Sequence, residues 1–299
     1  MNKSSGKGIA YVCLLIVFFF WGSVYVANRY ILQELEAMEL ACLRFLVSSI
    51  SLGLAILVSG QKIHVEKKDW KYMAFIGFMG YYLSMECTLL SVSYAGASLA
   101  SLINSLNPVF ITLFAAFFLK EKLTANKVIC LAIALVGVYI VSSGDVSGGQ
   151  TIGVIIGLGS ILTWAYACMY SRRLSARYSA LTITFLGITI SLIFHIPTAA
   201  ITLASVGIPH ITAKILLCIL YSGLCGTAIP QFLWNFALSR LEASTCSMFY
   251  PLMPIFSALL GVALLGEHIT ARFLIGGALI VSCVVISCLW QGRASKTSA

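Results

Sequence analysis

Residues 105–125 read SLNPVFITLFAAFFLKEKLTA, and residues 251–271 read PLMPIFSALLGVALLGEHITA. A shift of 146 positions brings identical residues of the two stretches into register. The matched residues are Leu106, Pro108, Phe110, Leu113, Leu119, Glu121, Thr124 and Ala125 with Leu252, Pro254, Phe256, Leu259, Leu265, Glu267, Thr270 and Ala271. The chain therefore carries an internal repeat that keeps its proline, glutamate and threonine in step.

The composition is that of a chain that faces lipid. Of the 299 residues, 60% are hydrophobic and 10% are charged, and the mean hydropathy is +0.98. A water-soluble domain has about a quarter of its residues charged. Because helices satisfy their own backbone groups inside a bilayer, we expect an all-α polytopic membrane protein. The 10 cysteines lie in apolar stretches without metal-ligand spacing, so we expect reduced thiols, no metal and no cofactor.

The apolar runs divide into ten expected spans, because a helix needs roughly 20 apolar residues to cross the hydrocarbon core. These expected spans 1 to 10 are residues 9–31, 37–59, 70–91, 95–119, 126–143, 151–171, 180–205, 212–239, 243–265 and 271–290. Each of the two repeat halves, residues 1–145 and 146–299, therefore holds five spans.

Lysine and arginine gather in alternate connections, which marks the cytoplasmic side of a membrane protein. The cations of these connections are Lys62, Lys67, Lys68, Lys71, Lys120, Lys122, Lys127, Arg172, Arg173, Arg177 and Arg240. We expect both termini on the cytoplasmic side of the cytoplasmic (inner) membrane. The net charge of +9 then encodes topology and does not indicate nucleic-acid binding.

Because five is an odd number, the second half is expected to be inverted relative to the first. Inverted repeats permit alternating access, in which a midplane site opens to each side in turn. The expected fold is therefore ten transmembrane helices in two inverted five-helix repeats around a central cavity.

Short motifs across the chain are similar to those of the EamA branch of the drug/metabolite transporter superfamily. They are W-G-S at 21–23, L-R-F at 43–45, A-S-L-A-S-L-I-N-S-L-N-P-V-F at 97–110, K-E-K-L-T at 120–124, L-W-N-F-A-L at 233–238 and E-A-S…P-I-F…G-E-H-I-T at 242–270. The resemblance covers nearly the whole chain. It implies a ten-helix fold with a central cavity and the secondary transport of a small metabolite, commonly outward.

Polar and aromatic residues inside the spans are the candidate substrate contacts, because such groups face protein or a water-filled cavity. The candidates are Trp21, Tyr25, Tyr81, Tyr82, Glu86, Asn104, Asn107, Trp164, Gln231, Asn235 and Tyr250. Trp21 and Trp164 hold matched places in the two halves, nearer the middle of their spans than interfacial anchors lie. For the amide side chains, helix packing is the alternative.

Two matched prolines predict a mechanical feature. Pro108 cannot donate a hydrogen bond to the carbonyl of Asn104, and Pro254 likewise leaves that of Tyr250 free. We expect hinges there, with a static kink as the alternative. We expect Glu121 to be an interfacial cap at the end of span 4.

Two opposite charges, Glu86 in span 3 and Arg44 in span 2, are expected at similar depth. A charged side chain at the middle of a helix costs about 2.5–3.5 kcal/mol on insertion scales, so pairing or protonation is expected. Either Glu86 forms a fixed ion pair with Arg44, or it binds a substrate amine. If Glu86 also exchanges a proton, transport is coupled to protons. His195 has no carboxylate at helical spacing, and we expect it to be a packing residue.

The sequence thus predicts a monomeric secondary active transporter that exports small metabolites, amino acids or amphipathic drug-like compounds. A proton-coupled uptake permease is the alternative. An intramembrane enzyme would need a catalytic constellation such as HExxH, and a scaffold would need a sizeable loop or tail; the sequence offers neither. The expected partners are a small-molecule substrate, the lipid bilayer and a proton as candidate coupling ion.

Overall fold

The fold is helical throughout the residues that can be placed. A computed structural model describes residues 3–95, 103–104, 106–142, 151–207 and 211–265, with a few positions between 274 and 286. In these ranges every regular element is a helix, which confirms the all-α class. Six helical stretches are long and apolar enough to cross a membrane, and Asn107–Leu119 and Val128–Gly137 are shorter apolar helices. Expected span 10 lies largely outside the described residues, so the count of ten remains a prediction.

Four of the expected spans are single long helices. They are α1 (Lys3–Ile31), α2 (Ala37–Ser59), α8 (Thr151–Leu174) and α9 (Ala180–Val206). Their ends follow local chemistry. The Ser179 hydroxyl accepts a hydrogen bond from Thr182 N–H at the start of α9, and Gly60 ends α2 with a φ of 62°. That left-handed conformation suits glycine, which has no Cβ.

Expected spans 3 and 8 each contain a π-helical segment that the sequence did not predict. Span 3 consists of the 3₁₀ turn η1 (Lys67–Asp69), α3 (Trp70–Phe75), the π segment η2 (Ile76–Leu83) and α4 (Ser84–Ala95). Span 8 consists of α10 (Ala213–Gly223), the π segment η3 (Leu224–Ala228) and α11 (Ile229–Arg240). Such π-helical segments are rare in proteins, and those that occur often lie at functional sites.

Expected span 9 is interrupted, because α12 (Ala243–Ser247) and α13 (Leu252–Leu265) are separated by a turn at residues 248–251. In expected span 4, α6 (Asn107–Leu119) begins directly before its proline. After α6, α7 (Ala125–Ser142) begins next to Thr124. Discontinuous helices are typical of transporter binding sites.

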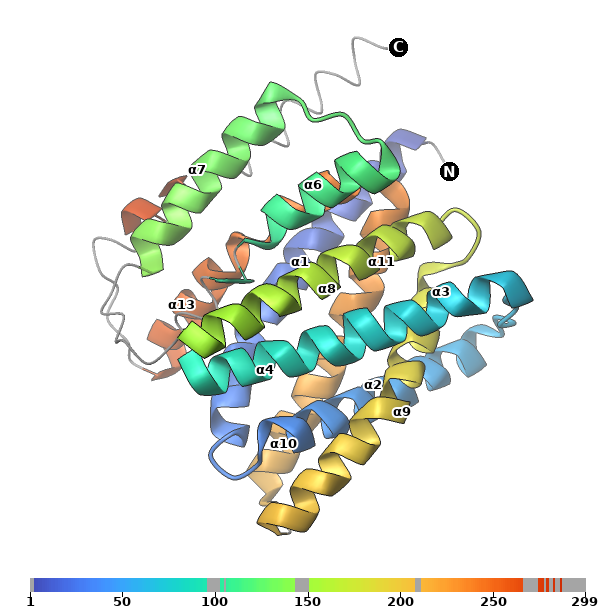
Figure 1. The fold of residues 1–299 in the computed structure, drawn as a ribbon, viewed down its shortest axis with the longest axis vertical. Coiled ribbons are helices and arrows are strands. Elements are labelled where there is room, and N and C mark those ends of the chain that lie inside the picture. Colours follow the sequence, from blue (N-terminus) through green and yellow to red (C-terminus); the bar gives the residue numbers. More distant parts are fainter. Residues whose placement is uncertain are drawn as a thin grey trace.

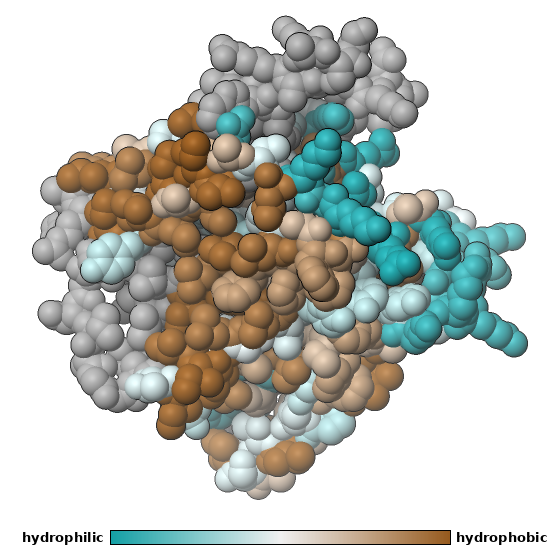
Figure 2. Space-filling model, turned by 45° about the horizontal axis from the view of Figure 1, so that its top comes forward, coloured by the Kyte–Doolittle hydropathy of each residue, from teal (hydrophilic) through white to brown (hydrophobic). Residues whose placement is uncertain are grey.

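The helices pack as a bundle (Figure 1), in which α4 lies along α8, α2 lies along α9, and α1 packs against α11 and α13. At Gly22, α1 packs closely against the start of α13, because an added Cβ would lie 2.8 Å from the Met253 carbonyl oxygen. Apolar side chains cover much of the face in Figure 2, and hydrophilic residues gather toward one end of the molecule. This distribution is expected of a protein surface that meets lipid.

Candidate functional site

An aromatic cluster lies where α1, α8, α11 and the turn before α13 meet. Its members, called the aromatic cluster below, are Phe18, Trp21, Trp164, Trp234 and Tyr250. The ring of Trp21 lies 6.3 Å from Trp164, 5.8 Å from Trp234 and 5.8 Å from Tyr250, measured between centroids. Phe18 lies 4.9 Å from Tyr250. The two tryptophans that the repeat places at matched positions therefore meet inside the bundle.

One hydrogen bond within the aromatic cluster joins α8 to the turn between α12 and α13. The indole N–H of Trp164 in α8 donates to the hydroxyl of Tyr250 in the turn between α12 and α13. Trp234 is 1% exposed, and its indole nitrogen has no hydrogen-bond partner among the described residues. Trp234 was not among the predicted site residues, although it lies directly before Asn235.

A polar group adjoins the aromatic cluster on the side of η2 and α9. The Asn235 amide nitrogen lies 2.9 Å from the Tyr81 hydroxyl, 2.9 Å from the Thr184 hydroxyl and 3.1 Å from the Gln231 carbonyl oxygen. The Tyr81 ring contacts Trp164 at 6.1 Å. Thr184 is fully buried in α9 and was missed by the sequence analysis.

Several buried polar atoms in this region have no partner among the described residues. They are Gln231 Oε1, Asn235 Oδ1, Trp234 Nε1 and Asn107 Oδ1. An unsatisfied buried polar group costs about 1–3 kcal/mol, so such atoms in a native protein need a reason. A substrate or water that reaches them would provide one.

The start of α6 shows what becomes of the Asn104 carbonyl, which Pro108 was expected to leave without a donor. Pro108 occupies the first turn of α6, where its missing N–H costs no helical hydrogen bond. The Asn104 carbonyl oxygen accepts a hydrogen bond at 2.9 Å from the Asn107 amide instead. Asn107 is 2% exposed. The Asn104 carbonyl, to which Pro108 cannot donate, therefore receives its hydrogen bond from the Asn107 side chain.

The second proline differs from expectation. The Tyr250 carbonyl oxygen is not free, because Met253 N–H donates to it at 3.0 Å in the turn that leads into α13. The side chains of Pro254 and Tyr25 lie outside the described residues, as does Glu267. The hinge role of both prolines remains a prediction.

Glu86 is paired with His195, which corrects two expectations. His195 Nδ1 lies 2.8 Å from Glu86 Oε1, and its Nε2 lies 3.1 Å from the Tyr81 carbonyl oxygen. The two side chains are 0% and 5% exposed. His195 is therefore not a simple packing residue, and the expected Glu86–Arg44 ion pair is not formed. The second carboxylate oxygen, Oε2, has no partner among the described residues.

Arg44 faces a different helix. Its Nε donates to the Thr227 hydroxyl at 2.8 Å, and a terminal nitrogen donates to the Gly226 carbonyl oxygen at 3.2 Å. The guanidinium also lies 4.0 Å from the sulfur of Met85. Since successive helical residues point about 100° apart, Met85 faces Arg44 while Glu86 turns toward α9.

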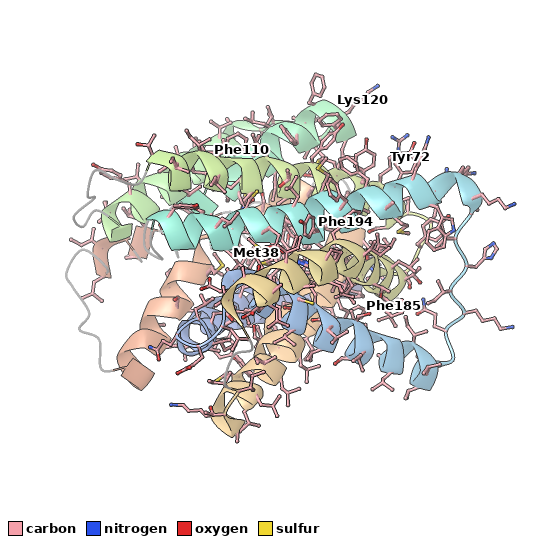
Figure 3. The ribbon with its side chains drawn as sticks, turned by 60° about the horizontal axis from the view of Figure 1, so that its bottom comes forward. Met38, Tyr72, Phe110, Lys120, Phe185 and Phe194 are labelled. Atoms are coloured by element: carbon pink, nitrogen blue, oxygen red, sulfur yellow. The ribbon has the colours of Figure 1, made fainter. Side chains whose placement is uncertain are left out.

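Tyr82 lies apart from the aromatic cluster. Its ring packs on α9 and contacts Phe194 at 5.4 Å and His195 at 5.1 Å. Figure 3 shows Phe194 between α9 and the helix of span 3. Tyr82 therefore covers the Glu86–His195 pair on one side.

Glu121 caps α12, a helix that begins 122 residues later in the chain. Its carboxylate accepts hydrogen bonds from Ala243 N–H at 2.9 Å, from Ser244 N–H at 3.3 Å and from the Ser244 hydroxyl at 2.5 Å. The expectation of an interfacial cap is thus met with an unexpected partner, α12. Glu242, the residue at the N-cap position of α12, makes no capping hydrogen bond with its side chain.

Comparison with known proteins identifies the relatives of this chain. The sequence profile of the EamA-like transporter family matches residues 8–143 and again residues 151–289. An uncharacterized transporter of Archaeoglobus fulgidus is 26% identical over 276 residues, which cover 92% of this chain and 97% of the relative. The uncharacterized inner membrane transporter YhbE of Escherichia coli is 25% identical and covers 86% of this chain and 81% of its own length.

A crystal structure of another protein has the same fold. It superposes with a TM-score of 0.81 at 18% identity, over 96% of this chain and 99% of the other. At that identity the likeness concerns the fold alone.

Proposed function

The chain belongs to the EamA-like transporter family, and we propose that this multi-pass membrane transporter exports a small metabolite across the cytoplasmic (inner) membrane by alternating access. Its two halves, residues 1–145 and 146–299, are inverted repeats in this proposal, and both termini are cytoplasmic. The family profile supports two halves because it matches each of them separately. The aromatic cluster, to which both halves contribute, is the proposed substrate site.

The packing of the helices supports a two-fold relation between the halves. If span n corresponds to span n+5, the pair α4–α8 corresponds to the pair α1–α11, and the pair α6–α8 to the pair α1–α13. All four pairs are in contact, and α2–α9, which corresponds to itself, is in contact as well. Such pairing is what repeats related by a pseudo-two-fold axis require.

The π segments support the same relation. Gly77 and Gly80 in span 3 lie 146 positions before Gly223 and Gly226 in span 8. The π segments η2 (Ile76–Leu83) and η3 (Leu224–Ala228) overlap under that shift. Each glycine permits close packing, since an added Cβ would lie 2.9 Å from the Gly187 carbonyl oxygen at Gly77 and 2.4 Å from Val24 at Gly226.

The carbonyls of the two π segments are bound across the halves. Arg44 of the first half donates to the Gly226 carbonyl of η3, and Nε2 of His195 in the second half lies within hydrogen-bonding distance of the Tyr81 carbonyl of η2. We call these two contacts the crossed clamps. This reciprocal arrangement is the single observation that most favours two interdependent halves moving against each other.

The chemistry of the site supports a partly apolar, neutral or zwitterionic substrate, such as an amino acid or an amphipathic drug-like compound. Three tryptophans and a tyrosine offer apolar faces. The unpartnered oxygens of Gln231 and Asn235 are acceptors for an N–H or O–H group.

Proton coupling is the proposed energy source, with the Glu86–His195 pair as the proton site. The Tyr81 carbonyl only accepts hydrogen bonds, so His195 Nε2 carries a hydrogen. In this proposal, the proton that the pair binds lies between Nδ1 and Glu86 Oε1, which are 2.8 Å apart. Its loss would leave a carboxylate facing an imidazole lone pair, and the clamp on η2 would weaken. The pair therefore links proton binding to the segment that carries Tyr81.

Glu86→Gln tests this coupling, because a glutamine amide can donate to Nδ1 and so mimic the protonated pair. Purified wild-type and variant proteins are reconstituted in liposomes and supplied with a metabolite panel under imposed pH gradients. We expect the wild type to move at least one panel compound against its gradient, driven by the proton gradient, and Glu86→Gln to lose that pH dependence while retaining thermal stability. Asp69→Asn is a matched control, since Asp69 lies in the same span but is held by Arg177 and Tyr178.

Equal pH dependence in the wild type and Glu86→Gln would refute the coupling. The direction of movement decides between export and the uptake permease, which is the second candidate. Transport of no panel compound together with a hydrolytic activity would overturn the transporter proposal.

A further inference from the structure

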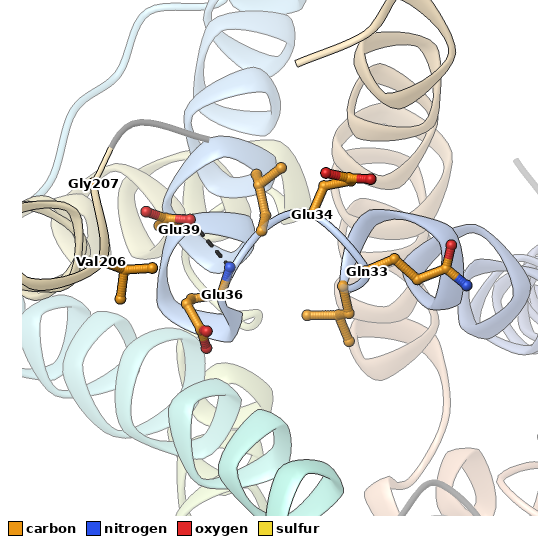
Figure 4. Close-up of a pocket in the computed structure, with 8 residues that line it drawn as sticks. Gln33, Glu34, Glu36, Glu39, Val206 and Gly207 are labelled. Carbon is orange, nitrogen blue, oxygen red and sulfur yellow. Dashed lines mark hydrogen bonds between the residues drawn. The ribbon is translucent and has the colours of Figure 1, made fainter. Parts of the chain in front are cut away.

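A small acidic pocket lies at the end of the molecule where α1 leads into α2, far from the connection between α2 and α3. Its volume is about 160 Å³, many times the roughly 10–15 Å³ that a single water needs. The lining residues are Leu32, Gln33, Glu34, Leu35, Glu36, Glu39, Val206 and Gly207. Figure 4 shows the walls, which come from the α1–α2 turn, the first turn of α2 and the end of α9.

The pocket is strongly negative. Three carboxylates line it, and none of them forms an ion pair within the described part of the chain. The C-terminal ends of α1 and α9 add partial negative charge, and the N-terminal end of α2 offsets only part of it, because each helix end carries about half an elementary charge. Such a pocket favours a cation.

Glu39 has a buried carboxylate oxygen without a hydrogen-bond partner among the described residues, which points to a ligand independently of the charge of the pocket. It is 6% exposed, and one of its carboxylate oxygens accepts a hydrogen bond from Glu36 N–H at 3.1 Å. Its other oxygen, Oε1, is buried without a partner among the described residues. In Figure 4 that oxygen points toward Val206 and Gly207. Capping of α2 explains the first oxygen but leaves the second unsatisfied, and an unsatisfied buried carboxylate oxygen needs a donor.

We propose that this pocket binds the ammonium group of a small organic cation, with Glu39 Oε1 as its buried acceptor and Glu34 and Glu36 as the surrounding charges. An ammonium supplies the N–H donors that a carboxylate oxygen requires, and its charge offsets the three carboxylates. The described residues include no group of three or more histidine, cysteine or acidic side chains placed to hold a metal ion, so an organic cation suits the pocket better than a metal. The site is separate from the aromatic cluster and does not depend on the proposed transport direction.

The binding test uses the purified full chain in mild detergent, with melting temperature as the readout, because a ligand that binds the native state raises it. Methylammonium chloride, magnesium chloride and sodium chloride are compared at equal ionic strength. We expect methylammonium to raise the Tm of the wild type above the sodium reference, with a smaller shift from magnesium.

Glu39→Gln removes the charge but keeps the cap, because glutamine is also accepted at this position of a capping box. We expect it to abolish the methylammonium shift. Glu34→Gln, an exposed residue outside the helix, should reduce the shift, and it keeps the proposal testable if Glu39→Gln does not fold. Glu66→Gln is the matched control and should retain the full shift, because Glu66 lies directly before η1, away from the pocket, and is paired with Lys68.

Three outcomes would overturn the proposal. The first is no methylammonium shift in the wild type. The second is a full shift in both Glu39→Gln and Glu34→Gln, which would place the amine elsewhere. The third is a larger shift from magnesium than from methylammonium, which would make this a metal site.

Discussion

The contact between Glu121 and α12 leads to a sharp prediction, because Glu121 lies 122 residues before Ala243 and joins the residues after α6 to the start of α12. The perturbation is Glu121→Ala. It removes an acceptor from two backbone N–H groups and from the Ser244 hydroxyl. Ala243 and Ser244 are 0% and 1% exposed, so water cannot easily replace the carboxylate.

The expected magnitude follows from these contacts. Loss of a capping side chain costs about 1–2 kcal/mol, and each buried donor left without a partner costs about 1–3 kcal/mol. The Ser244 hydroxyl can rotate to another acceptor, whereas the backbone N–H groups cannot. We therefore expect Glu121→Ala to lower the free energy of unfolding by about 2–4 kcal/mol, and Glu121→Gln, which keeps one acceptor oxygen, by about 1 kcal/mol.

The measurement is equilibrium unfolding of the purified protein in mixed micelles with increasing denaturing detergent. Glu66→Ala is the control, because it removes the same charge at the N-cap position of η1 without removing a capping hydrogen bond, and its pair with Lys68 is exposed. We expect the control to change the unfolding free energy by less than about 1 kcal/mol. Equal destabilisation by Glu121→Ala and Glu66→Ala would refute the reasoning, since it would mean that the buried hydrogen bonds of Glu121 add nothing to the loss of a carboxylate.

Two further predictions concern packing and pH. Gly226→Ala should destabilise the protein by about 1–3 kcal/mol, because the added Cβ would lie 2.4 Å from Val24. At Gly159 an added Cβ would meet nothing within 4 Å, so Gly159→Ala should stabilise α8 by about 0.5–1 kcal/mol. Thermal unfolding of both variants checks this prediction, and equal effects of the two substitutions would contradict it. The Tyr178 hydroxyl donates to Asp69 at 2.7 Å, which raises the pKa of Tyr178 above its usual value. This contribution to stability is present below the ordinary tyrosine pKa of about 10 and is lost as pH rises through the raised value. Tyr178→Phe should therefore reduce the fall in unfolding free energy at alkaline pH. An unchanged pH profile would contradict a stabilising hydrogen bond between Tyr178 and Asp69.

The positions of the long helices could be predicted because each is one apolar run between polar clusters. The expected spans 37–59 and 180–205 correspond to α2 (Ala37–Ser59) and α9 (Ala180–Val206). The composition of a membrane helix differs so much from that of its connections that hydropathy locates it. The π segment at Ile76–Leu83 left no such mark, because a change of hydrogen-bond register alters neither length nor hydropathy noticeably.

The candidate site was predicted in part, and the missed contacts have a common cause. Trp21, Trp164 and Tyr250 were found through repeat symmetry and polarity within apolar spans. The partner of Glu86 was missed because His195 lies 109 residues away, and helical spacing reports only neighbours on the same helix. A matching search for ionisable residues at equal depth in different spans would have suggested the pair.

The crossed clamps also set a condition on biosynthesis. The Tyr81 carbonyl cannot form its contact with His195 until the ribosome has added His195, which lies 114 residues later in the chain. At a synthesis rate of about 5–20 residues per second, that interval is roughly 6–23 seconds. The contact of Arg44 forms later still, since Gly226 lies 182 residues after it in the chain. The first half therefore enters the membrane with a buried cation and an irregular helix whose partners have not yet been made. The insertion machinery, or water retained beside the nascent helices, must accommodate both until the second half arrives.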